Sequence, residues 1–203
     1  MNSHLYFRIM EYVADLTSVI VPAALAGGIY VLARWRWLTR RGLPRKSWGN
    51  EGTRLLLVCW LAALLCLVWT PANFWHKLQY LILNGWPMEL GNVWFQGGFS
   101  LEVTFPARLM EALSGGSWQV LGNVLLYLPL GLLLPMVWRR GSWWRVTGAG
   151  LALSLVTELL QPVVGRSFDV DDLITNTLGT MLGYLLFALA RLVCRGVARR
   201  RSE

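Results

Sequence analysis

The sequence predicts an all-α fold, a polytopic transmembrane helical bundle of about five spans with the N-terminus outside and the C-terminus inside. Composition is the first indication, because 55% of the 203 residues are hydrophobic and only 15% are charged, which is far from a soluble domain. The second is the arrangement of charge, since the basic residues behind the formal charge of +8 fall in short clusters between long apolar runs. This arrangement indicates membrane topology and argues against a nucleic-acid-binding face.

Five apolar runs are long enough to cross a bilayer, because a helix rises about 1.5 Å per residue through a hydrocarbon core about 30 Å thick. We place the spans at approximately residues 13–33, 53–70, 119–138, 143–160 and 173–193. The segment before the first run lacks a basic leader and a small-residue cleavage site, so we expect that run to be retained as a span.

The basic residues set the predicted orientation. All of them fall on one side of the five spans except four, which are Arg8, Lys77, Arg108 and Arg166. Because cytoplasmic loops are enriched in Lys and Arg, the larger group is predicted to be cytoplasmic. The N-terminus is then outside and the C-terminus inside, which agrees with an odd number of spans.

The chain is predicted to have three parts. Residues 1–90 hold two spans and the start of an external segment, residues 91–194 hold three spans, and residues 195–203 form a basic cytoplasmic tail that would bind anionic lipid. In the external connection we expect an amphipathic interfacial helix at 74–84 and a second short helix at 107–113, with a glycine- and proline-rich loop between them.

Polar residues gather at the external ends of the last three predicted spans. The third and fourth spans contribute Asn123, Glu158 and Gln161, and the next loop and the fifth span contribute Arg166, Asp169, Asp171, Asp172 and Asn176. A carboxylate such as Glu158 near hydrocarbon costs a few kcal/mol and needs a partner or a watery cavity. We expect Arg166 to be that partner, since its planar fork binds carboxylates bidentately.

Two interpretations of this cluster remain open. Either it ties three helix ends together, with Asp169 or Asp171 capping the fifth helix, or it forms a ligand site that faces the cell exterior. Helix capping needs fewer polar groups than the cluster contains, and the excess favours a site.

The remaining unusual residues point to packing. Gly179 and Gly183 form a small-residue contact, which we assign to a neighbouring span of the same chain in preference to a dimer. Pro129, near Gly131, frees the carbonyl of Leu125 and either kinks the third span or shapes its packing. The two His residues lie too far apart to suggest metal ligands, so neither a metal site nor a cofactor is expected.

The same polar and glycine positions resemble the VanZ-like family. The matching stretches are GNVLLYLPLG at 122–131, TELLQ at 157–161 and GRSFDVDDLITNTLG at 165–179, continuing to Gly183 and Tyr184. About ten such positions over three spans are far more specific than a short motif. The resemblance covers roughly residues 91–193 and identifies the second part of the chain as a VanZ-like membrane domain.

The resemblance implies a multi-pass protein of the bacterial cytoplasmic membrane that is associated with the cell envelope. The protein after which the family is named is associated with low-level resistance to the glycopeptide teicoplanin, so the resemblance also implies a link to that resistance. It brings no known reaction, and an enzyme is the less favoured expectation.

Three functions are therefore compatible with the sequence. The leading one is an envelope protein whose external site binds a lipid-linked cell-wall precursor, a glycopeptide or another envelope protein. The second is a transporter or flippase of a polyprenyl-linked lipid, with Arg166 on the phosphate and the carboxylates coupled to protons. The third is a lipid-headgroup hydrolase or transferase, with Glu158 and Asp169 or Asp172 as acid and base or as Mg²⁺ ligands.

Overall fold

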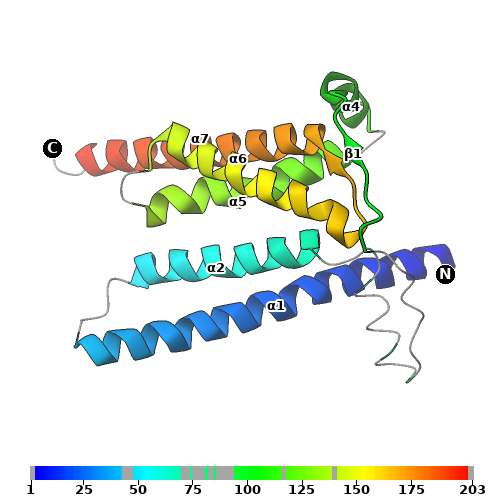
Figure 1. Ribbon diagram of the computed structural model, residues 1–203. Coiled ribbons are helices and arrows are strands. Elements are labelled where there is room, and N and C mark those ends of the chain that lie inside the picture. The colour runs from blue at the N-terminus through cyan, green and yellow to red at the C-terminus, as the bar shows by residue number, and fades with distance from the viewer. Residues whose placement is uncertain are drawn as a thin grey trace. The chain divides into compact units, whose positions relative to one another are not determined.

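The computed structural model describes residues 3–42, 48–69, 74, 81, 85, 94–115, 118–138 and 141–200 (Figure 1). Within these residues five helices are long and apolar enough to cross a membrane, over Val19–Arg41, Asn50–Trp69, Gln119–Val137, Trp143–Val164 and Val170–Ala198. The predicted class, an all-α membrane protein with five spans, is therefore confirmed. The predicted orientation of the termini stays a prediction, and the interfacial helix predicted at 74–84 lies almost entirely outside the described residues.

The chain divides into two compact units. The first unit contains helix α1 (Ser3–Arg41) and most of helix α2 (Trp48–Trp69). Helix α1 is longer than its predicted span of 13–33. It ends at Arg41 and is followed by Gly42, whose φ of +59° is the left-handed conformation that glycine adopts readily after a helix.

Backbone hydrogen bonds also stabilise a turn in the first unit. The 3-10 helix η1 (Gln161–Val164) ends at Gly165, with φ +77°. The Phe95 N–H donates to the Val163 carbonyl at 3.0 Å, and the Phe168 N–H donates to the Gly98 carbonyl at 3.0 Å. These bonds lead into the short strands β1 (Phe99–Ser100) and β2 (Phe168–Asp169), which pair with each other.

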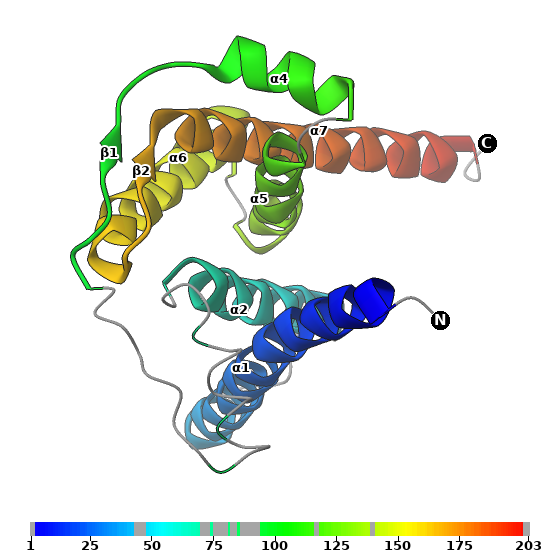
Figure 2. The same cartoon turned by 90° about the vertical axis from the view of Figure 1, so that its right-hand side faces the viewer.

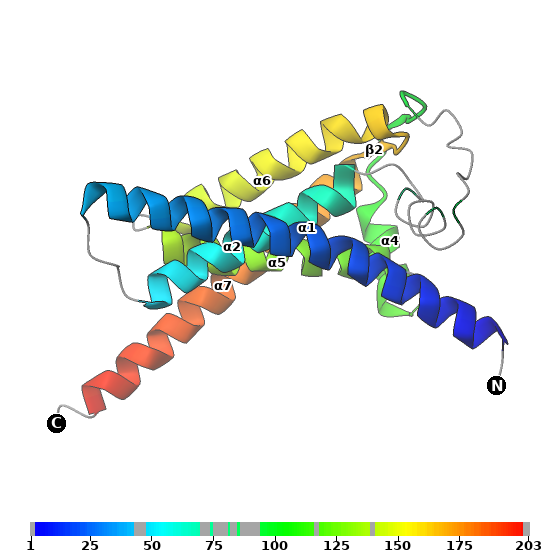
Figure 3. The same cartoon turned by 90° about the horizontal axis from the view of Figure 1, so that it is seen from below.

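The second unit contains the start of α2 and most of the described chain from Ser100 onward. Its helices are α4 (Phe105–Leu113), α5 (Gln119–Val137), most of α6 (Trp143–Leu160) and α7 (Val170–Arg200). Helix α4 confirms the short helix predicted at 107–113 and begins two residues earlier, because Pro106 fits the first turn of a helix. Figure 2 shows α4 beside the start of α7, and Figure 3 shows α7 continuing beyond α6 towards the C-terminus.

Glycines allow α5 and α7 to approach each other closely. A Cβ added at Gly131 would meet the Thr180 carbonyl, and one at Gly183 would meet the Leu128 carbonyl. Gly179 lies against the Val124 carbonyl in the same way. Backbone therefore packs directly on backbone, which is typical of small-residue contacts between membrane helices.

Candidate functional site

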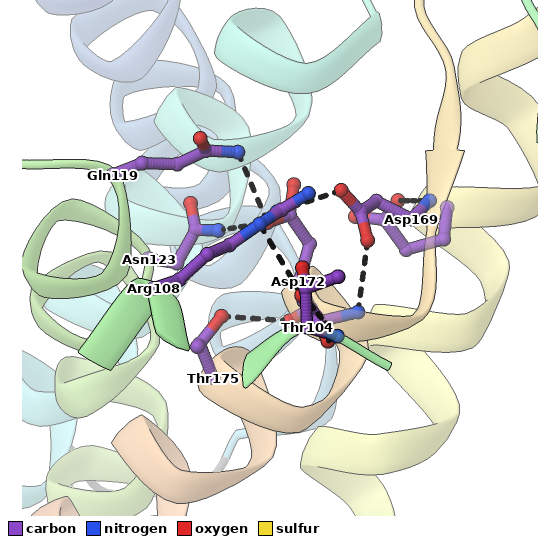
Figure 4. Close-up of polar contacts among 9 residues, drawn as sticks. Thr104, Arg108, Gln119, Asn123, Asp169, Asp172 and Thr175 are labelled. Atoms are coloured by element: carbon purple, nitrogen blue, oxygen red, sulfur yellow. Dashed lines mark hydrogen bonds and ion pairs between the residues drawn. The ribbon is translucent and has the colours of Figure 1, made fainter. Parts of the chain in front are cut away.

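A network of polar side chains occupies the end of the second unit where α5 and α7 begin and α6 ends. Figure 4 shows these side chains pointing towards one another from α4, α5 and the start of α7. The aspartates come from the first turn of α7 and the residue before it, where carboxylates face the free N–H groups of a helix. The network therefore forms where three helix ends need hydrogen-bond partners.

Arg108 of α4 is the centre of this network. Its Nη1 atom lies 2.8 Å from Asp169 Oδ2, and its Nε atom lies 3.2 Å from Asp171 Oδ2. The hydrogen bond to Asp169, with the charges of the nearby aspartates, raises the pKa of the Arg108 guanidinium. Arg108 therefore stays charged and neutralises part of the acidic cluster.

Asp171 is nearly completely buried, with 1% of its surface exposed. Both of its carboxylate oxygens accept the Thr104 N–H, at 3.0 and 3.1 Å, and Oδ2 also accepts the Thr104 hydroxyl at 2.5 Å. Its own N–H donates to Asp169 Oδ1 at 2.9 Å. Asp169, the residue before α7, thus caps this helix, while Asp171 fixes the start of α4 against it.

Asp172 and Glu158 join the other two helices to this network. Asp172 Oδ1 accepts from Asn123 Nδ2 at 2.7 Å and from Gln119 Nε2 at 3.4 Å, both on α5. Glu158, at 2% exposure, accepts the Asp169 N–H through Oε2 at 3.2 Å. The carboxylates therefore hold the ends of α5 and α6 on the first turn of α7.

The polar side chains form two layers. The end layer is Asn123, Glu158 and Asp172, one from each of α5, α6 and α7. One helical turn deeper lies the inner layer of Tyr127, Ser154 and Asn176, which Thr157, next to Glu158, joins through the Tyr127 hydroxyl. Because residues four apart share a helix face, the i and i+4 spacing within each helix produces this stacking.

The inner layer is buried and connected by hydrogen bonds. Asn176 Nδ2 donates to Ser154 Oγ at 2.9 Å, and the hydroxyls of Tyr127 and Thr157 are 2.9 Å apart. The Thr157 hydroxyl donates to the Ser154 carbonyl at 2.8 Å, so Tyr127 is the donor to Thr157. The four side chains are at most 4% exposed.

The Tyr127–Thr157 contact provides a test of this layer. In a double-mutant cycle of Tyr127→Phe and Thr157→Val, we expect a coupling of about 1 kcal/mol, because each variant breaks the same buried hydrogen bond. Thr177→Val is the matched control, since its hydroxyl donates to the Leu173 carbonyl of its own helix. Thermal unfolding in detergent measures all the variants, and a cycle without coupling would show that the hydrogen bond contributes nothing.

The structure places the predicted site residues in different parts of the fold. It brings together Asn123, Glu158, Asp169, Asp171 and Asp172, with Asn176 in the inner layer. Gln161 and Arg166 belong to the first unit, where the Arg166 N–H donates to the Gln161 carbonyl at 3.0 Å. The exposed Arg166 guanidinium donates to the Leu67 carbonyl at 3.4 Å.

Several members of the network were not predicted from the sequence. Arg108 was placed on the external side but not in the cluster, and it is the arginine that pairs with Asp169 and Asp171. Thr104 and Gln119 were also missed, as were Tyr127, Ser154 and Thr157 of the inner layer. The inner residues had a detectable signal, because each lies four residues from a predicted site residue or next to Glu158 on a helix.

The carboxylates of the network have donors within the protein. Among the residues that the structure describes, no group of three or more His, Cys, Asp or Glu side chains is arranged to hold a metal ion. The carboxylate oxygens of Asp169 and Asp171 are instead engaged by N–H and O–H donors and by Arg108. The site is thus a preformed hydrogen-bond network in a helical membrane bundle.

These features define a polytopic α-helical membrane protein with a buried acidic site, and sequence comparison identifies its family. The chain belongs to the VanZ/LLP1 family, whose model matches residues 54–191. This confirms the predicted family, and the match begins at α2, before the region 91–193 that carries the motifs. The chain is also similar to Protein VanZ of Enterococcus faecium, with 32% identity over 145 residues, 70% of this chain and 77% of that protein. No solved structure matches the chain.

Proposed function

We propose that this protein is a multi-pass component of the bacterial cytoplasmic membrane that contributes to glycopeptide (teicoplanin) resistance. In this proposal the acidic network at the ends of α5, α6 and α7 binds an envelope ligand or a partner protein. Membership of the VanZ/LLP1 family and similarity to VanZ, a protein associated with teicoplanin resistance, support the biological role. The network supports the location of the site.

The balance of charge in the network carries the proposal. Within the described residues of the network, the carboxylates of Asp169 and Asp171 both pair with the guanidinium of Arg108, while Asp172 accepts hydrogen bonds from the neutral amides of Asn123 and Gln119. Such a surplus of acceptors favours a ligand that presents a positive charge or several hydrogen-bond donors. It disfavours an anionic phosphate at this position, which separates this proposal from the transport of a polyprenyl phosphate.

Antibiotic susceptibility tests the proposed role. In a teicoplanin-sensitive host that expresses the protein, we expect Asp172→Asn and Glu158→Gln each to remove the gain in resistance. Asp172→Asn removes the negative charge of the group that accepts hydrogen bonds from Asn123 and Gln119. Glu158→Gln leaves a weaker acceptor for the Asp169 N–H. The measurement is the minimum inhibitory concentration, with membrane levels of each variant determined by immunoblot.

The matched control is Glu111→Gln, which removes an exposed carboxylate on α4. This variant is expected to behave as wild type. Resistance retained by both network variants at normal membrane levels would exclude the network from the function. Absence of any resistance with the wild-type protein would exclude the biological role.

We also propose the orientation that the basic residues predict, with the network on the external side. In a chain with Cys59, Cys66 and Cys194 replaced by Ala, Ser167→Cys should react with an impermeant maleimide in intact cells, since this position is exposed. Arg200→Cys, exposed near the end of α7, should react only after permeabilisation. The opposite labelling pattern would place the network in the cytoplasm and refute the proposed external site.

A further inference from the structure

A buried acceptor without a donor lies in the inner layer. Asn176 is 4% exposed and its Nδ2 group donates to Ser154 Oγ, but its Oδ1 atom is completely buried and has no hydrogen-bond partner among the described residues. An unsatisfied buried carbonyl costs about 1–3 kcal/mol, so a helix core is expected to supply a donor there. None of the known or proposed features of the protein uses this oxygen.

The hydroxyls of Ser142 and Thr147 are also buried without a partner in the part of the chain that the structure describes, but they differ from Asn176 in chemistry. Thr147 lies on α6, where a hydroxyl can rotate to donate to a carbonyl of the preceding turn, and Ser142 precedes this helix, outside the inner layer. The amide oxygen of Asn176 is only an acceptor, and exchanging it with Nδ2 would leave the amide N–H groups without an acceptor in its place. Asn176 Oδ1 therefore requires a donor from outside its own helix.

We propose that the inner layer binds an ordered water molecule that donates a hydrogen bond to Asn176 Oδ1. The second hydrogen of this water has acceptors nearby, because the hydroxyl oxygens of Ser154 and Tyr127 each carry two lone pairs. The Ser154 hydroxyl is itself within hydrogen-bonding reach of Tyr127. Buried waters usually have two to four such polar partners, and this layer supplies them.

The packing below the inner layer indicates that the water site is the closed end of the polar region. Thr180, one turn beyond Asn176, is fully buried and its hydroxyl donates to the Asn176 carbonyl at 3.1 Å. Its side chain lies against Gly150 and its carbonyl against Gly131. The polar region thus extends two helical turns from the end of the bundle and stops at tight packing.

Radiolytic hydroxyl-radical labelling of the whole protein in nanodiscs tests the proposal, because radicals that form from a bound water oxidise the side chains beside it. Tyr127 is only 1% exposed, so its oxidation reports internal water. In the wild type we expect Tyr127 to be oxidised, with the 76% exposed Trp118 as the reference for dose. Mass spectrometry of the peptides gives both rates.

Asn176→Leu removes the acceptor and should abolish most of the Tyr127 oxidation, whereas Asn176→Asp keeps an acceptor oxygen and should retain it. Thr177→Val, one residue along α7, is the matched control and should leave the rate unchanged. An unlabelled Tyr127 in the wild type would overturn the proposal without any variant. Undiminished labelling in Asn176→Leu would also overturn it, since the water would then not depend on Asn176.

Discussion

Replacing Gly131 with alanine is expected to reduce the free energy of unfolding by about 1–3 kcal/mol. The added Cβ would meet the Thr180 carbonyl and would lie 2.7 Å from the Tyr184 nitrogen, both of which are backbone atoms of α7. Neither atom can move without shifting the helix, so α5 and α7 would have to separate. Gly183→Ala should have a similar effect, because its Cβ would meet the Leu128 carbonyl of α5.

Two other glycines on the same helices provide matched controls. A Cβ at Gly122 on α5 or at Gly196 on α7 has no neighbour within 4 Å. Alanine favours a helix over glycine by up to about 1 kcal/mol, so Gly122→Ala and Gly196→Ala should be neutral or stabilising. Thermal unfolding followed by size-exclusion chromatography measures the four variants. Equal stability of the Gly131 and Gly122 variants would contradict close packing of α5 on α7.

Much of the fold could be predicted because membrane helices follow simple constraints. Apolar length alone located α5 and α6 almost to the residue. Helix α1 was placed less well, since Glu11 before the predicted span and Arg34 after it bound the apolar run without ending the helix. A helix needs satisfied backbone hydrogen bonds more than continuous hydrophobicity, so charged residues near an end are tolerated.

The polar residues of the last three helices could also be predicted, because helix geometry relates position in the chain to depth. Asn123, Glu158 and Asp172 lie near the predicted ends of three spans, and the structure joins them through Asp169 and direct bonds. Their depth was predictable without knowledge of their contacts.

The arginine of the network could not be chosen from the sequence. Arg166 lies three residues from Asp169 in the chain, while Arg108 lies 61 residues away. Which of the two meets the aspartates depends on how the segment before α5 folds back, and periodicity contains no information about such a loop. The bonds between Thr104 and Asp171, which anchor α4, are non-local for the same reason.

The second large effect is expected at Asp171, where one side chain joins α7, α4 and Arg108. Asp171→Asn preserves the shape but removes the charge, and its NH₂ group must replace one of two oxygens that both accept hydrogen bonds. Donor would then face donor at Thr104, and Arg108 would lose a charged partner. We expect the free energy of unfolding to fall by about 3 kcal/mol, the lower end for a broken buried pair because the Arg108 side chain is 29% exposed.

A partly exposed ion pair on α2 is the control for this prediction. Arg54 and Glu51 are 3.5 Å apart at i and i+3, with side chains 30% and 19% exposed, and such pairs contribute at most about 0.5 kcal/mol. Chemical unfolding of Asp171→Asn and Glu51→Gln in the same detergent should therefore separate the two variants clearly. Equal losses in the free energy of unfolding would show that the Asp171 carboxylate contributes no more than the partly exposed pair on α2. Helix α4 would then not depend on Asp171. A loss confined to Asp171→Asn, together with reduced teicoplanin resistance, would mean that the proposed site requires α4 to be fixed on α7.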